Sequence, residues 1–272
     1  MKSLRARWPS LQGGVVSGKP LLLCLDYDGT LVPLADHPSQ ARLPASTRNV
    51  LKQLAGQAGV VVALISGRTL RDLRRLVAVT GVSYAGNHGL EAEGNRVQYR
   101  NPAAEANRPR LKQIARALTA ALRPVEGAWV EDKGLTLSIH WRAVPRSAQR
   151  RFHRLVGQVL APDLAHGALR VTQDQRAVEI RPPVDWDKGR AIGWFLEHAS
   201  DRQHPARARL IYLGDDRTDE DAFRAVNRLG GISVFVGRPV RRTAAAYWLK
   251  DPDAVRAWLA GLSDARRRAH HP

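Results

Sequence analysis

Short apolar runs alternate with segments of helical periodicity along most of this chain. The apolar runs cover residues 21–25, 60–65, 82–85, 209–213 and 232–236, and each has the length and composition of a buried strand. The segments with a helical pattern that alternate with these runs are 47–57, 69–77, 188–198 and 219–229. Because strands that alternate with helices are typical of βαβ units, the pattern predicts a parallel, doubly wound α/β sheet.

The alternation stops near Arg100, and a different pattern fills the middle of the chain. Helical stretches at 104–122 and 147–160 are each followed by two short strands, at 128–131 and 135–142 and then at 169–172 and 177–181. This order predicts an α+β module with an antiparallel sheet. We therefore expect a Rossmann-like core over 20–103 and 184–262 with an inserted α+β cap at 104–183. A flexible leader is expected at 1–19 and a basic, solvated tail at 263–272.

Composition narrows the class of protein without identifying it. Of the 272 residues, 44% are hydrophobic and 25% charged, which is ordinary for a globular protein. The single cysteine, Cys24, excludes a disulfide framework within the chain. No apolar stretch approaches the roughly 18–20 residues that a membrane span requires, and the N-terminus has no apolar signal core. We expect a cytoplasmic protein without a membrane partner, with a monomer as the working hypothesis.

The net charge of +18 favours an anionic partner. The arginines are scattered through every segment instead of forming one stripe with interleaved aromatics, and only Arg266, Arg267 and Arg268 form a compact cluster. A phosphorylated small molecule accounts for this charge as well as nucleic acid does. We therefore predict a small-molecule substrate and no nucleic-acid partner.

Two carboxylates follow the first predicted strand directly, in the sequence Asp26-Tyr27-Asp28-Gly29-Thr30. Like charges at one strand end repel each other unless a cation or a shared proton relieves them. The carboxyl ends of the strands are also where ligands bind in open α/β sheets, and a Gly-Thr turn offers backbone N–H groups to a phosphate. The motif fits an aspartate nucleophile for phosphoryl transfer with Mg²⁺ as the relieving cation. A turn capped by an aspartate remains the structural alternative.

Three further motifs follow other strands or open helices. The segment 214–221 holds five acidic residues, and this much negative charge at one strand end predicts a site for Mg²⁺, although some of the acids can cap the next helix. Ser66-Gly67-Arg68 follows the second strand, where Ser66 could bind a phosphate oxygen or simply cap a helix. Lys188, at the start of a helix, could neutralise a phosphoryl group.

These four motifs, in the order in which they occur along the chain, resemble the haloacid dehalogenase superfamily of aspartate-nucleophile phosphatases. Longer segments are similar to those of the trehalose-6-phosphate phosphatase family, and they lie at 86–91, 130–134, 138–142, 178–182 and 214–223. The resemblance covers about residues 20–260. It implies a haloacid dehalogenase core with a cap, Mg²⁺ as cofactor, and trehalose 6-phosphate as substrate.

The resemblance also implies a role for each matching residue. Asp26 would be the nucleophile, Asp28 the general acid and base, and Ser66 and Lys188 the groups that hold the phosphoryl oxygens. The implied metal ligands are Asp26, the backbone carbonyl of Asp28, and Asp215, with support from Asp216 and Asp219. The implied substrate-binding residues are Gly67, Arg68, Asn87, His88, Glu131, Lys133, His140, Arg142 and Glu179.

Strand alternation gives independent support to part of this set. In the predicted strand 135–142, His140 and Arg142 share the polar face, which could meet a sugar, and Glu179 lies on the polar side of its own strand. A half-exposed antiparallel sheet shows the same alternation without any ligand. Phosphatases of sucrose phosphate or of glycosyl-phosphoglycerate remain alternatives, and so does a sugar-phosphate sensor without turnover. Because Asp26 and Asp28 are both present, the sequence favours an enzyme.

Overall fold

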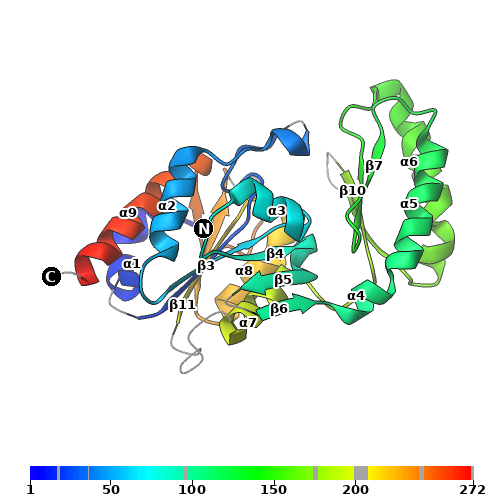
Figure 1. The fold of residues 1–272 in the computed structure, drawn as a ribbon. Coiled ribbons are helices and arrows are strands. Elements are labelled where there is room, and N and C mark those ends of the chain that lie inside the picture. Colours follow the sequence, from blue (N-terminus) through cyan, green and yellow to red (C-terminus); the bar gives the residue numbers. More distant parts are fainter. Residues whose placement is uncertain are drawn as a thin grey trace. The chain divides into compact units, whose positions relative to one another are not determined.

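The computed structural model describes residues 1–16, 19–35, 37–94, 97–173, 177–198, 208–238 and 242–270. The chain forms two compact units. The first comprises Met1–Tyr99 and Trp186–Pro272, and the second comprises Arg100–Asp185. Figure 1 gives the labels of the helices and strands. The predicted junctions at 103/104 and 183/184 lie close to these divisions.

Within the residues that the structure describes, the first unit is built on a nine-stranded sheet. Its strands, in spatial order, are β1 (Lys2–Ser3), β13 (Tyr247–Leu249), β12 (Ile232–Val236), β11 (Arg209–Gly214), β2 (Leu21–Leu25), β3 (Val60–Ile65), β4 (Ser83–Gly86), β5 (Glu91–Gly94) and β6 (Val97–Arg100). All neighbours from β1 to β4 are parallel, and β5 is antiparallel to β4. The predicted parallel α/β core is confirmed.

Helices cover both faces of this sheet (Figure 1). One face carries α1 (Leu4–Val16), α2 (Ala45–Ala55), α3 (Leu70–Val77) and α9 (Pro252–His270), and the other carries α7 (Lys188–His198) and α8 (Glu220–Arg228). In β2, Leu21, Leu23 and Leu25 pack into the first apolar cluster, while Leu22 and Cys24 pack into the second. Burial on both faces explains why the strand reads as an unbroken apolar run.

The order in which strands are added to the sheet reverses at β2. The strand lies between β11 and β3, so the segments that follow it in sequence lie on one side and those from the end of the chain on the other. The carboxyl ends of strands at such a switch point are the usual ligand site of an open α/β sheet. Asp26 lies at this point, where its N–H donates to Leu213 O at 2.9 Å.

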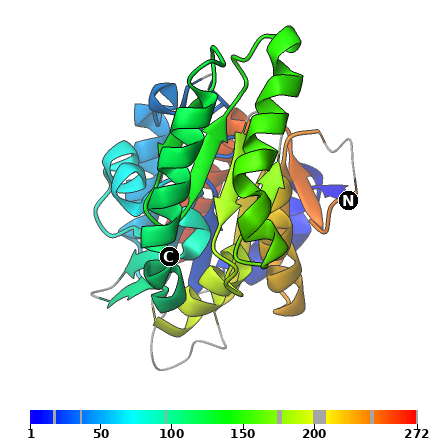
Figure 2. The ribbon, with the colours of Figure 1, turned by 90° about the vertical axis from the view of Figure 1, so that its right-hand side faces the viewer.

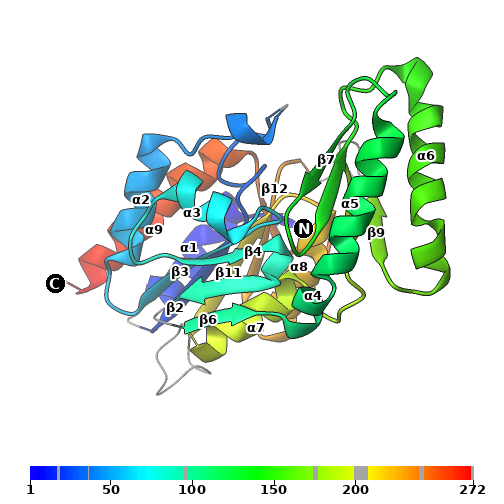
Figure 3. The same ribbon diagram turned by 45° about the vertical axis from the view of Figure 1, so that its right-hand side comes forward.

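The described part of the second unit contains a four-stranded antiparallel sheet in the order β7 (Trp129–Asp132), β8 (Leu137–His140), β10 (Ala177–Arg181) and β9 (Arg170–Gln173). Helices α5 (Arg108–Leu122) and α6 (Arg146–Ala165) cover one face of this sheet (Figures 2 and 3), and α4 (Pro102–Ala106) precedes them. The predicted α+β module is confirmed. The single helical stretch expected at 104–122 is two helices, because the chain breaks at Asn107, just before Pro109.

The N-terminal segment is not the flexible leader that the sequence predicted. Residues 2–3 form β1, which pairs with β13, and residues 4–16 form α1. Leu4 and Val15 are buried, and the ring of Trp8 meets that of Trp258 edge to face at 5.0 Å. A proline and two glycines within α1 give the segment poor helix propensity, so tertiary packing decides its conformation.

The basic tail predicted at 263–272 is largely part of α9, which runs to His270. Arg266 is only 1% exposed, and its guanidinium donates to Val15 O at 2.6 Å and to Lys19 O at 3.2 Å. This cation therefore ties the last helix to the first, while residues 271–272 lie outside the described residues. None of the described helices is long and apolar enough to cross a membrane.

Candidate active site

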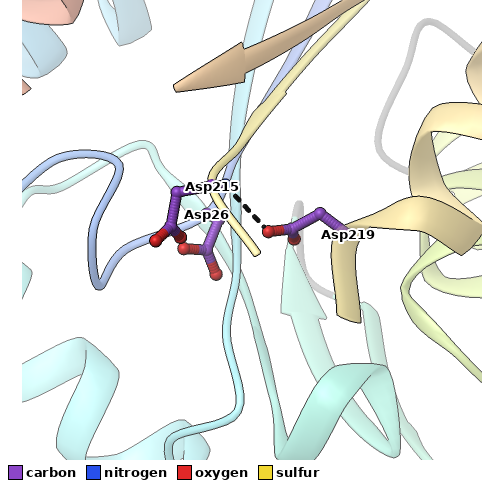
Figure 4. Close-up of side chains that lie close together, drawn as sticks. All are labelled: Asp26, Asp215 and Asp219. Atoms are coloured by element: carbon purple, nitrogen blue, oxygen red, sulfur yellow. Dashed lines mark hydrogen bonds between the residues drawn. The ribbon is translucent and has the colours of Figure 1, made fainter. Parts of the chain in front are cut away.

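Three carboxylates, two of them buried and that of Asp215 partly buried, meet at the carboxyl ends of β2 and β11 (Figure 4). Asp26 follows β2 directly, Asp215 follows β11, and Asp219 lies in the 3₁₀ turn Arg217–Asp219 that precedes α8. One oxygen from each can be chosen so that all lie within 4.8 Å of one another. Oxygen donors at this spacing fit a hard divalent cation.

Lys188 supplies a positive charge to this cluster. Its side chain is 3% exposed, and Nζ lies 2.7 Å from Asp26 Oδ1 and 2.7 Å from Asp219 Oδ1. The helix α7 that begins at Lys188 packs against the sheet and brings this ammonium to the strand ends. A fully buried ammonium is tolerated only when it is paired in this way.

Asp219 organises the loop that follows β11. Its Oδ2 accepts hydrogen bonds from the backbone N–H groups of Asp215 and Asp216, both at 2.9 Å. Its Oδ1 accepts from the hydroxyl of Tyr212 at 2.5 Å in addition to the ammonium of Lys188. Sequence reasoning missed Tyr212, although it is the only hydroxyl-bearing residue within β11.

Burial and mutual repulsion set the protonation of the cluster. Burial raises the pKa of Asp26 to about 8, and Asp219 adds to this effect while Lys188 opposes it. Burial, followed by the charges of Asp26 and Asp219, raises the pKa of Asp215 well above its usual range. Burial lowers the pKa of Lys188, but the charges of Asp219 and Asp26 outweigh burial and raise it. Lys188 alone does not balance three carboxylates, so a bound divalent cation would relieve the remaining repulsion.

Asp28 makes a different set of contacts. Its two carboxylate oxygens accept from Nε and Nη2 of Arg68, each at 2.7 Å, and Arg68 also lies over the ring of Tyr27, with 5.4 Å between its guanidinium carbon and the ring centroid. Gly29 has φ of 80°, and a Cβ there would lie 1.9 Å from Asp215 Oδ2. The glycine after Asp28 is therefore needed for both its conformation and the approach of Asp215.

The remaining predicted residues of the first unit include two whose side chains already make local hydrogen bonds, Asp216 and Ser66. Asp216 Oδ1 accepts from the backbone N–H and the hydroxyl of Thr218, so this carboxylate caps the 3₁₀ turn. Ser66, which is 2% exposed, accepts from the N–H of Arg68 at 3.2 Å. Asn87 and His88 lie buried in the 3₁₀ turn at residues 87–89, at the carboxyl end of β4.

Three of the predicted sugar-binding residues of the second unit, Glu131, His140 and Glu179, lie on the sheet face opposite α5 and α6, and Lys133 reaches this face from the turn after β7. Glu179 Oε1 accepts from Lys133 Nζ at 2.8 Å and from Ser138 Oγ at 2.5 Å. Glu131 Oε2 lies 2.8 Å from His140 Nε2. Burial raises the pKa of Glu131, but its hydrogen bond with His140 and the charge of Lys133 outweigh burial, and the net shift is downward.

Arg142 does not lie where strand alternation placed it. Strand β8 ends at His140, and residues 142–144 form a turn closed by a hydrogen bond from Val144 N to Trp141 O at 2.9 Å. The chain turns here because Pro145 follows and α6 begins directly after it. Arg142 is exposed in this turn, so the inference that it shares a strand face with His140 is wrong.

The α/β core and the buried acidic cluster at its switch point define a phosphatase of the haloacid dehalogenase superfamily. The model of the trehalose-phosphatase family matches residues 24–253. The chain belongs to this family, and its activity is that of a trehalose-phosphatase.

Individual relatives agree with the family assignment. The chain is 33% identical over 262 residues to trehalose-phosphate phosphatase B of Arabidopsis thaliana, an alignment that covers 92% of this chain and 68% of the relative. It is 38% identical over 245 residues to the trehalose-phosphate phosphatase of Mycobacterium marinum, covering 88% of this chain and 60% of that protein. The C-terminal domain of the Candida albicans trehalose-6-phosphate phosphatase shares the fold, with a TM-score of 0.81 at 21% identity over 94% of this chain and 96% of that one.

Proposed function

We propose that this chain hydrolyses trehalose 6-phosphate to trehalose and phosphate in the presence of Mg²⁺, through an aspartyl-phosphate at Asp26. The observation that carries this proposal is the carboxylate of Asp26, which lies at the switch point of the sheet among Lys188, Asp215 and Asp219. The family assignment supports the reaction and the substrate.

In the first step, a carboxylate oxygen of Asp26 attacks phosphorus and the bond from phosphorus to the sugar oxygen breaks. Asp28 gives a proton to the departing sugar oxygen. In the second step a water molecule attacks the same phosphorus, Asp28 takes its proton, and the bond from Asp26 to phosphorus breaks. Phosphate leaves, and both carboxyl groups return to their starting states.

The groups around Asp26 neutralise and orient the phosphoryl group. Lys188 and Ser66 would bind its oxygens, with the backbone of Gly67 and the guanidinium of Arg68 alongside.

The acidic residues of the same site would hold the metal ion. Asp26, the backbone carbonyl of Asp28, and Asp215 would bind Mg²⁺, with Asp216 and Asp219 in support through the hydrogen bonds described above. When bound, Mg²⁺ supplies positive charge that stabilises the transferring phosphoryl group.

The second unit would provide recognition of the sugar. Its polar sheet face carries hydroxyl, carboxylate, imidazole and ammonium groups suited to sugar hydroxyls, and the predicted contacts there are Glu131, Lys133, His140 and Glu179. Arg142 would contribute from the turn after β8. Lys133 and Glu179 form an ion pair with each other, and this pairing holds both side chains in place.

Phosphate release with Mg²⁺ and with EDTA tests the proposal, using trehalose 6-phosphate, sucrose 6-phosphate and glucose 6-phosphate in parallel. Mg²⁺-dependent release from trehalose 6-phosphate alone, abolished by Asp26→Asn, is the expected result. Release mainly from another sugar phosphate would contradict the proposal that trehalose 6-phosphate is the substrate, but it would agree with the proposed chemistry at Asp26. No release from any of them would contradict the proposed enzymatic function. Undiminished release by Asp26→Asn would contradict the assignment of Asp26 as the nucleophile.

A further inference from the structure

The segment 86–91 is hydrogen-bonded to the loop Ser66-Gly67-Arg68, called here the 66–68 loop. The N–H of Asn87 donates to Arg68 O at 2.7 Å, and the N–H of His88 donates to Ser66 O at 2.9 Å. The N–H of Ser66 in turn donates to Ala85 O at 2.9 Å. Both ends of the 66–68 loop are therefore fixed to the backbone that follows β4.

The backbone that makes these contacts has an uncommon conformation. Asn87 and His88 have φ of 48° and 59°, so two consecutive residues with side chains lie in the left-handed region. Such a conformation persists only where the surrounding structure holds it in place. The side-chain contacts of Asn87 show what holds it.

Glu91 occupies the centre of this arrangement. It is 7% exposed, and its Oε1 accepts from Asn87 Nδ2 and from the backbone N–H of Leu70, both at 2.8 Å. Leu70 is the first residue of α3 and follows the 66–68 loop after one residue. A single carboxylate oxygen therefore joins the turn after β4 to the helix that begins after the loop.

Close packing leaves the 66–68 loop little room to shift. A Cβ on Gly67 would lie 2.7 Å from Cε1 of His88, and a Cβ on Gly86 would lie 2.2 Å from Leu70 N. The two glycines thus permit the approach of the two segments, and Asn87 and Glu91 hold them together.

We propose that Glu91, acting through Asn87 and Leu70, is a positioning residue for the 66–68 loop and makes no contact with substrate. This inference rests on the proposed function, in which Ser66 and Arg68 line the phosphoryl site. Arg68 donates to both carboxylate oxygens of Asp28. The contacts of Glu91 that fix the 66–68 loop therefore also orient the carboxylate of Asp28. Glu91 therefore affects phosphate binding and turnover and leaves sugar recognition unaffected.

Three variants test this role: Glu91→Ala, Glu91→Gln and, as a matched control, Glu93→Ala. Glu93 lies on the same strand and its carboxylate contacts the same helix, through Arg74 at 2.9 Å, about one turn after the helix start. Glu91→Ala is expected to lower kcat by about 10- to 100-fold, since a displacement of about 1 Å in a positioned group has this effect. It should also weaken the binding of inorganic phosphate with Mg²⁺, while inhibition by trehalose stays unchanged.

Glu91→Gln separates a hydrogen-bonding role from a need for charge. Its carboxamide oxygen can accept the same two hydrogen bonds, so kcat and phosphate affinity should stay within about threefold of wild type. The proposal is wrong if Glu91→Gln is as damaged as Glu91→Ala. It is equally wrong if Glu91→Ala behaves like Glu93→Ala, or if it changes trehalose inhibition while phosphate affinity is unaltered.

Thermal unfolding shows whether each variant is folded. If Glu91→Ala does not fold, Gly67→Ala provides a second test, because its methyl group would lie 2.7 Å from Cε1 of His88, so that the loop or the buried imidazole must shift. Unchanged phosphate affinity in Gly67→Ala would overturn the proposal. A wild-type protein that binds inorganic phosphate but releases none from trehalose 6-phosphate would refute the proposed function, while the phosphate affinities of the variants would still decide the role of Glu91.

Discussion

The ammonium nitrogen of Lys188 lies 2.7 Å from Oδ1 of Asp26, although 162 positions separate the two residues in the sequence. Both side chains are almost completely buried. The pair joins the end of β2 to the segment that re-enters the core after the second unit. A cation distant in the sequence therefore sets the electrostatic environment of the proposed nucleophile.

Lys188→Met should remove most of the activity and some stability. The carboxylates of Asp26 and Asp219 would lose their shared cation, and breaking a buried ion pair costs about 3–5 kcal/mol. We expect kcat to fall at least about 100-fold, as it does when a preorganised charge is removed from an active site. Steady-state kinetics and denaturant unfolding measure the two effects.

The matched control for Lys188→Met is Arg224→Met on α8. Arg224 forms an exposed ion pair with Asp221, so its replacement should change neither kcat nor stability appreciably. Wild-type kcat in Lys188→Met would show that the phosphoryl group does not depend on this ammonium.

The stabilisation of the protein by Mg²⁺ should increase with pH. The pKa of Asp26 is raised from 3.8 to about 8, chiefly by burial, so between these values the folded protein binds a proton that the unfolded chain does not. The contribution of Asp26 to the stability of the metal-free protein therefore falls as pH rises through this window. Mg²⁺ requires the ionised carboxylate and must displace that proton below about pH 8.

The measurement is the difference in Tm between samples with Mg²⁺ and with EDTA, taken near the lower and the upper end of this pH window. We expect a larger difference at the upper end and a weaker dependence on pH in Asp26→Asn. Because Tm with Mg²⁺ is compared with Tm in EDTA at the same pH, the effects of groups that titrate without contact with the cation cancel. A difference in Tm that stays constant or falls as pH rises would contradict the predicted competition between the cation and the proton.

Glu179→Gln should affect recognition of the sugar without affecting the chemistry at phosphorus. The carboxamide oxygen of glutamine can still accept from Lys133 Nζ, but it carries no negative charge, so the ion pair at 2.8 Å is lost and the polar sheet face is disturbed. We expect kcat/KM for trehalose 6-phosphate to fall about 10- to 100-fold, the range for a hydrogen bond to a charged group. Hydrolysis of p-nitrophenyl phosphate, which has no sugar, should remain unchanged.

Thr172→Val is the matched control for this prediction. Thr172 lies opposite Glu179 in the register of β9 and β10 and is exposed. An equal loss on both substrates in Glu179→Gln would indicate damage to folding or to the core, and it would contradict a role in recognition.

Arg266→Ala should destabilise the protein although the residue is part of an apparently expendable basic run. Its guanidinium is buried and donates to Val15 O and Lys19 O, so its removal leaves two backbone carbonyls without these donors. A loss of about 2 kcal/mol or more in the free energy of unfolding is expected. Arg268→Ala, at an exposed position two residues along the same helix, should change stability by less than about 0.5 kcal/mol. Equal midpoints of urea unfolding for the two variants would contradict this account.

The parts of the fold that could be predicted share one physical property. Strands β2, β3, β11 and β12 are buried on both faces, so their residues are largely apolar and stand out in the sequence. Asp26 and Asp215 each follow such a strand, and the carboxyl ends of adjacent parallel strands necessarily lie together. Position relative to a recognisable strand is enough to bring these two carboxylates into one site.

Other features depend on partners that are distant in the sequence. Helix α1 has a poor intrinsic propensity and forms against α9, and Arg266 is buried only because the two helices meet. Tyr212 could not be recognised because its contact depends on the position of Asp219. Arg142 was misplaced because the end of β8 depends on the turn that leads into α6.

The sequence by itself determined the alternating α/β core, the antiparallel module and the motifs of an aspartate-nucleophile phosphatase, because periodicity and strand ends are local properties of a chain. The tertiary structure alone decided how the charges are matched: Lys188 with Asp26 and Asp219, Arg68 with Asp28, and Glu91 with Asn87 and Leu70. These pairings arise where segments distant in sequence are buried together, and the cost of burying an unpaired charge then determines which groups must meet.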